Sequence, residues 1–258
     1  MYHLVARTSV GLLFTTWEEA HALWGRITRA CPGMEALCLM PNHVHLQHRQ
    51  DLRVPLAQAL RGHSRSLNAA QGLRGNRIEP LPAAHFAADA QKRRRETRYI
   101  HLNPCRARLV DDPLAWPWST YRDAVGLALR PVRARHPDPE RLHAYTSSDP
   151  SVNTDGSGLP ARSGQDPTLH ELRAAVSGYT RTPLHRLDDR GAPRRLLLQS
   201  ARALVPLSTS ELARQLGTSP STLRRLPPAD RHVEQVARLV GDLRFPGVPT
   251  GRGYWTRR

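Results

Sequence analysis

The sequence predicts an α+β fold: a ferredoxin-like or RRM-like antiparallel sheet with helices on one face, followed by a small all-α helix-turn-helix domain. Three observations support this class. The first 71 residues read as strand, helix, strand, strand, helix. Residues 131–167 are rich in Pro, Ser, Asp and Gly and show little periodicity. After them the apolar residues recur only at helical spacing.

The elements of the sheet follow from the spacing of apolar residues and from capping signals. Thr15-Thr16 precede a helix, and Cys31-Pro32-Gly33 end it. Pro41-Asn42 reads as a tight turn between two strands. The predicted strands are 2–7, 34–40, 43–48 and a short edge strand at 83–88; the predicted helices are 17–30, 54–71 and 89–102, with a further helical piece from Pro104 to Val110. We expect helices to pack on one face of this sheet.

These patterns divide the chain into four parts. Residues 1–126 form the sheet domain, which the aromatic stretch Trp116–Tyr121 closes. Residues 127–167 are expected to be a linker, largely disordered, because they are polar and show little periodicity. Residues 168–245 form a helical domain and residues 246–258 a flexible tail.

The composition favours a polyanionic partner. The 258 residues carry a formal net charge of +16, with Lys92 as the one lysine among the basic residues. A charge this large favours nucleic acid first and an acidic membrane surface second. No apolar run is long enough to cross a bilayer, and Cys31, Cys38 and Cys105 are too widely spaced for a zinc knuckle. We therefore expect a cytoplasmic, nucleoid-associated protein with reduced thiols and no membrane partner.

A pair of histidines marks the candidate reactive face of the sheet. His43 and His45 alternate with Val44 and Leu46, so both imidazoles lie on the face opposite the core. The two rings are spaced about 6.6 Å apart along the strand, close enough to bind one metal ion. A pair of solvated or hydrogen-bonded histidines would give the same pattern, so a third ligand is needed to distinguish the two.

Tyr99 and Asn103 supply candidates for the missing groups. They lie four residues apart and therefore on one face of the same helix. Two histidines and one amide would complete a three-ligand site beside a free phenol. A phenol is a weak nucleophile at its usual pKa of about 10 and needs a Lewis acid to polarise the phosphodiester that it attacks. A half-buried packing tyrosine remains the alternative.

Further basic and polar residues are candidates for nucleic-acid contacts. Arg93, Arg94, Arg95 and Arg98 precede or flank Tyr99, although a solvated basic helix face is the alternative for each. Residues 209–226 have the spacing of a helix-turn-helix, with Gly217 at the turn and Ser219 as the cap of the second helix. A plain helical hairpin would also fit. The exposed residues of that second helix are Ser221, Thr222, Arg224 and Arg225.

Three motifs in order resemble the REP-associated tyrosine transposases of the HUH single-tyrosine superfamily. They are Met40-Pro41-Asn42-His43-Val44-His45-Leu46, Arg98-Tyr99-Ile100-His101-Leu102-Asn103-Pro104-Cys105-Arg106-Ala107 and Trp116-Pro117-Trp118-Ser119-Thr120-Tyr121. The resemblance covers about residues 2–126. Residues 194–226 separately resemble the C-terminal helical domain of the bacterial replication initiator.

The resemblance implies a metal-dependent single-stranded DNA endonuclease and strand transferase that acts on hairpin DNA through a phosphotyrosine intermediate. It implies Tyr99 as the nucleophile, and His43, His45 and Asn103 as ligands of Mg²⁺ or Mn²⁺. The partners would be single-stranded or hairpin DNA and, through the C-terminal domain, duplex DNA. The protein would be a monomer or a homodimer, with the tyrosine serving its own subunit or the partner's.

The sequence departs from the family pattern at two places. Residues 79–90 contain Pro80, Pro82 and alanines where the family has an aromatic and basic strand, and Arg108 stands at the position of a usual glycine. These departures support an alternative function, a catalytically weakened DNA-binding protein that uses the helix-turn-helix. A histidine-based metallohydrolase without a nucleic-acid partner does not explain the charge.

Overall fold

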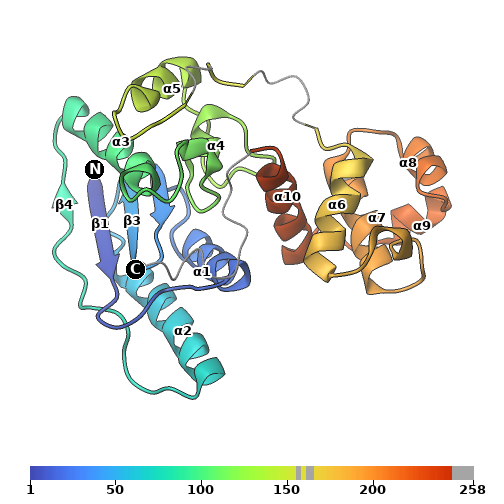
Figure 1. The fold of residues 1–258 in the computed structure, drawn as a ribbon, viewed down its shortest axis with the longest axis horizontal. Coiled ribbons are helices and arrows are strands. Elements are labelled where there is room, and N and C mark those ends of the chain that lie inside the picture. Colours follow the sequence, from blue (N-terminus) through green and yellow to red (C-terminus); the bar gives the residue numbers. More distant parts are fainter. Residues whose placement is uncertain (155–157, 161–165, 246–258) are drawn as a thin grey trace. The chain divides into compact units, whose positions relative to one another are not determined.

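The protein divides into two compact units in the computed structural model, which describes residues 1–154, 158–160 and 166–245 (Figure 1). The first unit contains residues 1–126 and 131–160, and the second contains residues 127–130 and 166–245. The predicted tail, residues 246–258, lies outside the described residues. No helix in the described ranges is both long and apolar enough to cross a lipid bilayer.

A four-stranded antiparallel sheet forms the centre of the first unit and confirms the predicted fold class. Its strands are β1 (Tyr2–Arg7), β2 (Ala36–Leu39), β3 (His43–His48) and β4 (His85–Phe86). They lie in the order β2-β3-β1-β4, which is the ferredoxin-like order. In the central pair Leu4 faces Leu46 and Val5 faces His45. The predicted edge strand is present, but only two of its residues pair with β1.

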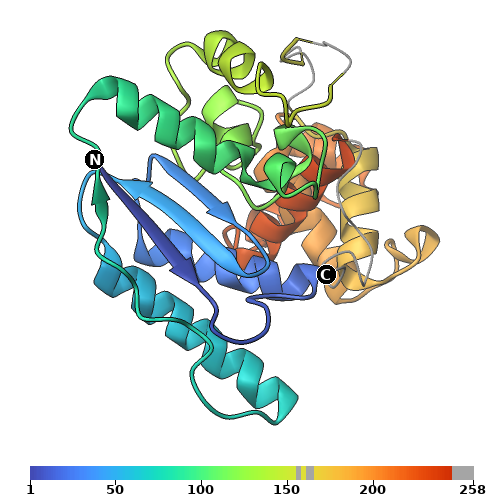
Figure 2. The ribbon, with the colours of Figure 1, turned by 60° about the vertical axis from the view of Figure 1, so that its left-hand side comes forward.

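The two faces of the sheet have different covers (Figure 2). Helices α1 (Trp17–Ala30) and α2 (Arg53–Gln71) pack together on one face, where alternate residues such as Leu4, Val44 and Leu46 are buried. Helix α3 (Ala90–Arg106) lies on the other face, the side of His43 and His45. The Thr97 hydroxyl of α3 donates a hydrogen bond to Gln47 Oε1 of β3 at 2.6 Å. The polar face of β3 is therefore covered by a helix, so helices pack on both faces of the sheet and not on one face alone as predicted.

The aromatic stretch 116–121 packs along the free edge of β2. The Trp116 indole donates to the carbonyl oxygen of Leu39 at 2.9 Å, and Thr120 Oγ1 accepts from the Leu37 amide at 2.9 Å. Trp116, Trp118 and Tyr121 are fully buried. These bonds satisfy an edge that would otherwise expose unpaired amides. The short elements η1 (Pro113–Ala115) and α4 (Tyr121–Val125) flank this stretch.

Two expectations about helix boundaries in the first unit are corrected. Helix α3 continues through Pro104 to Arg106 instead of breaking there, because the proline lies in the last turn, where few backbone bonds depend on it. Part of the predicted linker forms helix α5 (Pro139–Ser147), which packs on α3 and α4. Asp138 caps α5 through the Arg141 amide at 3.0 Å, with Pro139 at the first helical position.

The second unit is all helical, as predicted. Its elements are α6 (Leu169–Thr180), η2 (Leu184–Arg186), α7 (Ala192–Leu204), α8 (Thr209–Gln215), α9 (Pro220–Arg225) and α10 (Arg231–Leu243). Helices α6, α7 and α10 pack around a core that includes Leu172, Leu197 and Val236. Gly217 makes the turn between α8 and α9 with a φ of 58°, and Leu223 anchors α9 in the core. The predicted pair of helices around a glycine turn is therefore present.

Candidate active site on the α3 face of the sheet

The two histidines of β3 lie at the start of the strand, directly after the turn at Pro41-Asn42. The Asn42 side-chain oxygen lies 2.7 Å from His43 Nδ1, the ring nitrogen nearer the backbone, and this contact orients the ring. The rings of His43 and His45 are perpendicular, with centroids 4.9 Å apart. The strand alternation thus places both imidazoles side by side on one face, as predicted.

Burial keeps both imidazoles neutral. Desolvation lowers the pKa of His43, although a hydrogen bond with Asn103 opposes the shift. The pKa of His45 falls to about 3, because its ring is buried and because His43, His3 and Arg7 all disfavour another positive charge. A neutral imidazole keeps a nitrogen lone pair, which is the form that binds a metal ion.

Helix α3 brings Asn103 and Tyr99 to the same place. Asn103 Oδ1 lies 3.4 Å from His43 Nε2, and its amide nitrogen donates to the Tyr99 carbonyl oxygen at 3.0 Å. The Tyr99 ring stands edge-on to His45, with centroids 5.5 Å apart. Tyr99 is 40% exposed, whereas His45 and Asn103 are buried. A single chain therefore brings together the four residues proposed for catalysis and metal binding.

Two residues that the sequence interpretation did not select also belong to this site. His3 Nε2 lies 3.0 Å from His45 Nδ1, so one ring nitrogen donates to the other. Burial lowers the pKa of His3 as well. Arg106, one helical turn beyond Asn103, places its guanidinium carbon 5.2 Å from the centre of the Tyr99 ring. The alternation of β1, with Leu4 and Ala6 in the core, is the sequence signal that could have revealed His3.

The donor set is suitable for a divalent cation. It consists of two neutral imidazoles and one amide oxygen, and Asn103 interacts with both histidines. If His45 Nδ1 donates to His3, its Nε2 keeps the lone pair, an arrangement that often orients metal-binding histidines. The described residues contain no group of three or more His, Cys, Asp or Glu side chains arranged for a metal. The amide would thus be needed as the third ligand.

The arginines proposed for DNA contacts have different environments. Arg94 and Arg95 are exposed on α3. Arg93 donates to the Ala88 carbonyl oxygen at 2.8 Å, close to the start of the helix. Arg98 is the least available, because it donates to Ser148 Oγ at 3.1 Å and lies over the Tyr145 ring at 4.4 Å. Its position supports a role in holding the segment after α5 against α3.

The polar residues of α9 are at the surface of the second unit. Ser219 caps the helix, and its hydroxyl lies 2.8 Å from the hydroxyls of both Ser221 and Thr222. Ser221, Thr222, Arg224 and Arg225 are all exposed. Their accessibility is compatible with the predicted DNA contact, which stays a prediction.

The structure also shows what the departures from the family pattern do. Arg108 has a φ of 55°, in the left-handed region that favours glycine. This backbone conformation explains why glycine is usual at the position. Part of residues 79–90 runs beside β1 despite its prolines. The Glu79 amide donates to the Arg7 carbonyl oxygen at 2.9 Å, and the Ala87 amide donates to the Met1 carbonyl oxygen at 2.8 Å. Both departures are therefore compatible with the backbone of the fold.

The chain is similar to a solved protein structure. No protein-family model matches the chain, and no curated protein sequence matches it. The solved structure is a REP-associated tyrosine transposase bound to a REP hairpin. The chain is similar to that protein with 20% identity and a TM-score of 0.37, over 63% of this chain and 91% of that one.

Proposed function

We propose that the first unit is a metal-dependent single-stranded DNA endonuclease and strand transferase that acts on hairpin DNA. One observation carries the proposal: an exposed phenol, Tyr99, stands 5.5 Å ring to ring from a buried neutral histidine. That histidine, His45, is grouped with His43 and Asn103, which are suitable cation ligands. The net charge of +16 supports a nucleic-acid substrate.

In the proposed reaction Tyr99 is the nucleophile. Its phenolic oxygen forms a bond to a backbone phosphorus, and the bond from that phosphorus to one sugar oxygen breaks. The phenol proton passes to solvent, and the departing oxygen takes up a proton to become a free hydroxyl. The number of phosphate ester bonds is unchanged, so the reverse attack by a strand-end hydroxyl can rejoin DNA.

The remaining side chains prepare this step. His43, His45 and Asn103 would hold Mg²⁺ or Mn²⁺, whose chemistry is Lewis-acid polarisation of the phosphodiester. His3 orients the His45 ring through the 3.0 Å contact. Arg106, which is paired with Asp149 at 2.8 Å, packs its guanidinium against the Tyr99 ring and positions it. The geometry supports action of Tyr99 within its own subunit, while the oligomeric state stays a prediction.

The proposal is tested by Tyr99→Phe. Hairpin oligonucleotides labelled at the 5′ or the 3′ end are incubated with protein and Mn²⁺ or with EDTA, then run on a denaturing gel. We expect a covalent adduct with the wild type and Mn²⁺ only, and no adduct with Tyr99→Phe. The label retained on the protein identifies which side of the nick is bound.

Tyr145→Phe is a matched control. Tyr145 is 39% exposed and also lies under an arginine, Arg98, but it is not in contact with the histidines. We expect this variant to form the adduct at the wild-type rate. An adduct that persists in Tyr99→Phe, or that is lost equally in Tyr145→Phe, would exclude Tyr99 as the nucleophile.

The same gel, combined with a titration of duplex binding against salt, distinguishes the alternative function, a DNA-binding protein with a weakened catalytic unit. The observation that favours it is the exposure of Ser221, Thr222, Arg224 and Arg225 on α9. In that case the wild type binds duplex DNA with a steep dependence on salt but forms no adduct with any of the labelled oligonucleotides.

A further inference from the structure

A second basic feature of the first unit lies on the opposite face of the sheet from Tyr99. Between Asp51 and Glu79 the sequence contains five arginines and no acidic residue. This stretch comprises α2 and the loop that follows it. One of the five, Arg53, is paired with Asp51 at 2.8 Å. The other four have no carboxylate partner in the described structure.

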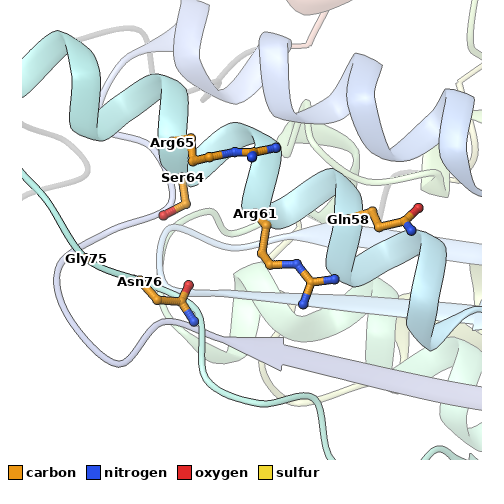
Figure 3. Close-up of a pocket in the computed structure, with 6 residues that line it drawn as sticks. All are labelled: Gln58, Arg61, Ser64, Arg65, Gly75 and Asn76. Atoms are coloured by element: carbon orange, nitrogen blue, oxygen red, sulfur yellow. The ribbon is translucent and has the colours of Figure 1, made fainter.

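Part of this stretch forms a pocket of about 400 Å³ between α2 and the loop (Figure 3). The side chains and backbone that line it are Gln58, Arg61, Ser64, Arg65, Gly75 and Asn76. No acidic and no aromatic side chain is among them. The lining therefore offers many hydrogen-bond donors together with two positive charges.

Arg61 and Arg65 have no anionic partner among the described residues. They are one helical turn apart and exposed, and neither side chain forms an ion pair or hydrogen bond with a described residue. Two like charges at this spacing repel each other and destabilise a helix. An anion bound between them would remove that repulsion, and guanidinium groups match the geometry of phosphate oxygens.

Ser64 supplies an independent indication of a ligand. It is only 4% exposed, and its buried hydroxyl has no hydrogen-bond partner within the described residues. Figure 3 shows this hydroxyl directed toward the loop with Gly75 and Asn76. A buried hydroxyl without a partner is unfavourable, so a ligand oxygen is a natural acceptor for it.

The loop wall of the pocket is held in place by its own hydrogen bonds. The Asn68 side chain donates to the Gly75 carbonyl oxygen at 2.8 Å and accepts from Arg77. Asn76 accepts from the Ile78 amide at 3.1 Å and donates to its carbonyl oxygen at 2.8 Å. Gly75 has a φ of 103°, which a residue with a side chain rarely adopts. A fixed wall reduces the entropy lost when a ligand binds.

We propose that this pocket binds a phosphate group of the DNA backbone, at a site separate from the Tyr99 site. The absence of aromatic lining gives a base no surface on which to stack, so recognition rests on the phosphate. The adjacent arginines Arg74 and Arg77 extend the positive charge beyond the pocket, as a continuous chain of phosphates requires. The inference does not depend on DNA cleavage.

The test measures hairpin binding by fluorescence anisotropy across a range of salt, in the Tyr99→Phe background so that no covalent product forms. The pocket variant is Arg61→Gln with Arg65→Gln. We expect it to bind about tenfold more weakly and to reduce the slope of log affinity against log salt by about 1 to 2. Ser64→Ala should weaken binding while leaving the melting temperature unchanged or raised, because it removes an unpartnered buried hydroxyl.

Arg49→Gln with Arg53→Gln is the matched control, since it removes the same net charge from the same unit. Both arginines already have carboxylate partners, Glu35 and Asp51. We expect less than about a twofold loss of affinity from this pair. Equal losses in the pocket and control variants would overturn the proposal, because they would reflect net charge alone.

A second arm separates DNA backbone phosphate from a free phosphate compound. Inorganic phosphate is titrated at constant ionic strength while the melting temperatures of the wild type and the pocket variant are followed. Phosphate stabilisation of the wild type alone, with unchanged hairpin affinity in the pocket variant, would assign the pocket to a free anion and overturn the DNA proposal. Lower hairpin affinity confined to the pocket variants supports it.

Discussion

The polar residues of the two units are held in opposite ways. On the sheet, His45 and Asn103 are buried, and they come from segments almost sixty residues apart. On α9, the polar residues are exposed and contiguous, and a single buried side chain, Leu223, anchors the helix. Burial fixes the positions of side chains and disfavours their charged forms, which suits a reactive or metal-binding site. Exposed side chains stay charged and flexible, which suits contact with a polyanion.

This contrast has a consequence for mutations. A change on the sheet face should alter reactivity or stability strongly, because each buried group is packed and hydrogen-bonded. A change on α9 should alter mainly affinity. Three changes in the first unit, each measured against the second unit, test how differently the two units respond.

The largest expected effect is that of His45→Ala. Removing one ligand of the proposed cation site should reduce the rate of adduct formation more than about 100-fold. Mutation of residues that only hydrogen-bond to metal ligands already lowers metal affinity or activity about 10- to 100-fold. Duplex binding through the second unit should be unchanged. The measurements are the Mn²⁺-dependent adduct rate and the duplex affinity.

His48→Ala is the control for that change. His48 is also buried in β3, but its Nδ1 accepts from the Gln50 amide at 2.8 Å and its Nε2 donates to the Pro32 carbonyl oxygen at 3.2 Å, away from Tyr99. It should lower stability and leave the adduct rate intact. Equal loss of activity in both variants would show that β3 needs its histidines for folding alone.

The second effect is on stability at low pH. Burial lowers the pKa of His101 from 6.5 to about 3. At pH 5 the unfolded chain therefore binds a proton that the folded chain does not, so this stability is present above about pH 6.5 and is lost as the pH falls toward 3. His101→Phe should recover about 2 kcal/mol of unfolding free energy at pH 5 relative to pH 7.

Four of the five tryptophans, Trp17, Trp24, Trp116 and Trp118, lie in the sheet unit, and residues 166–245 contain none. With Trp255→Phe as the common background, tryptophan fluorescence therefore measures this pH dependence for the sheet unit. In the second unit His170 and His185 are exposed and His232 is half-buried. Hydrogen exchange in α7 and α10 should therefore change less between pH 7 and 5. An identical pH dependence in His101→Phe and the wild type would contradict the assignment.

The smallest effect compares one strained position in each unit. Arg108 and Arg181 both have a φ of 55°. Relief of left-handed strain by Arg108→Gly should stabilise the first unit by roughly 0.5 kcal/mol, after the greater freedom of glycine in the unfolded chain is subtracted. Urea unfolding measures it, with Arg181→Gly as the equivalent change in the second unit. Destabilisation by Arg108→Gly would show that the arginine side chain makes a stabilising contact.

Most of the secondary structure and all three proposed ligands could be read from the chain. Alternation predicted the face of His43 and His45, and four-residue spacing put Tyr99 and Asn103 on one helix face. These features depend on residues near each other in sequence. His3 was missed because its partner, His45, is 42 residues away and the pairing depends on strand register.

The errors have the same origin. Residues 127–167 are polar and aperiodic, so they were predicted to be largely disordered, yet Asp149 pairs with Arg106 at 2.8 Å and α5 packs on α3. Arg98 stays a predicted DNA contact, and the sequence did not reveal that the same segment also binds its side chain through Ser148. Each of these contacts joins segments more than forty residues apart, which no local pattern encodes.

The sequence by itself determined the local conformations, the faces of the helices and strands, and the excess of positive charge, because these follow from neighbouring residues and composition. Only the tertiary structure decided that a phenol, two imidazoles and an amide meet, which arginines are already engaged, and that α2 and its loop enclose a basic pocket. Those outcomes depend on strand register and helix packing, which sum many weak contacts between distant parts of the chain.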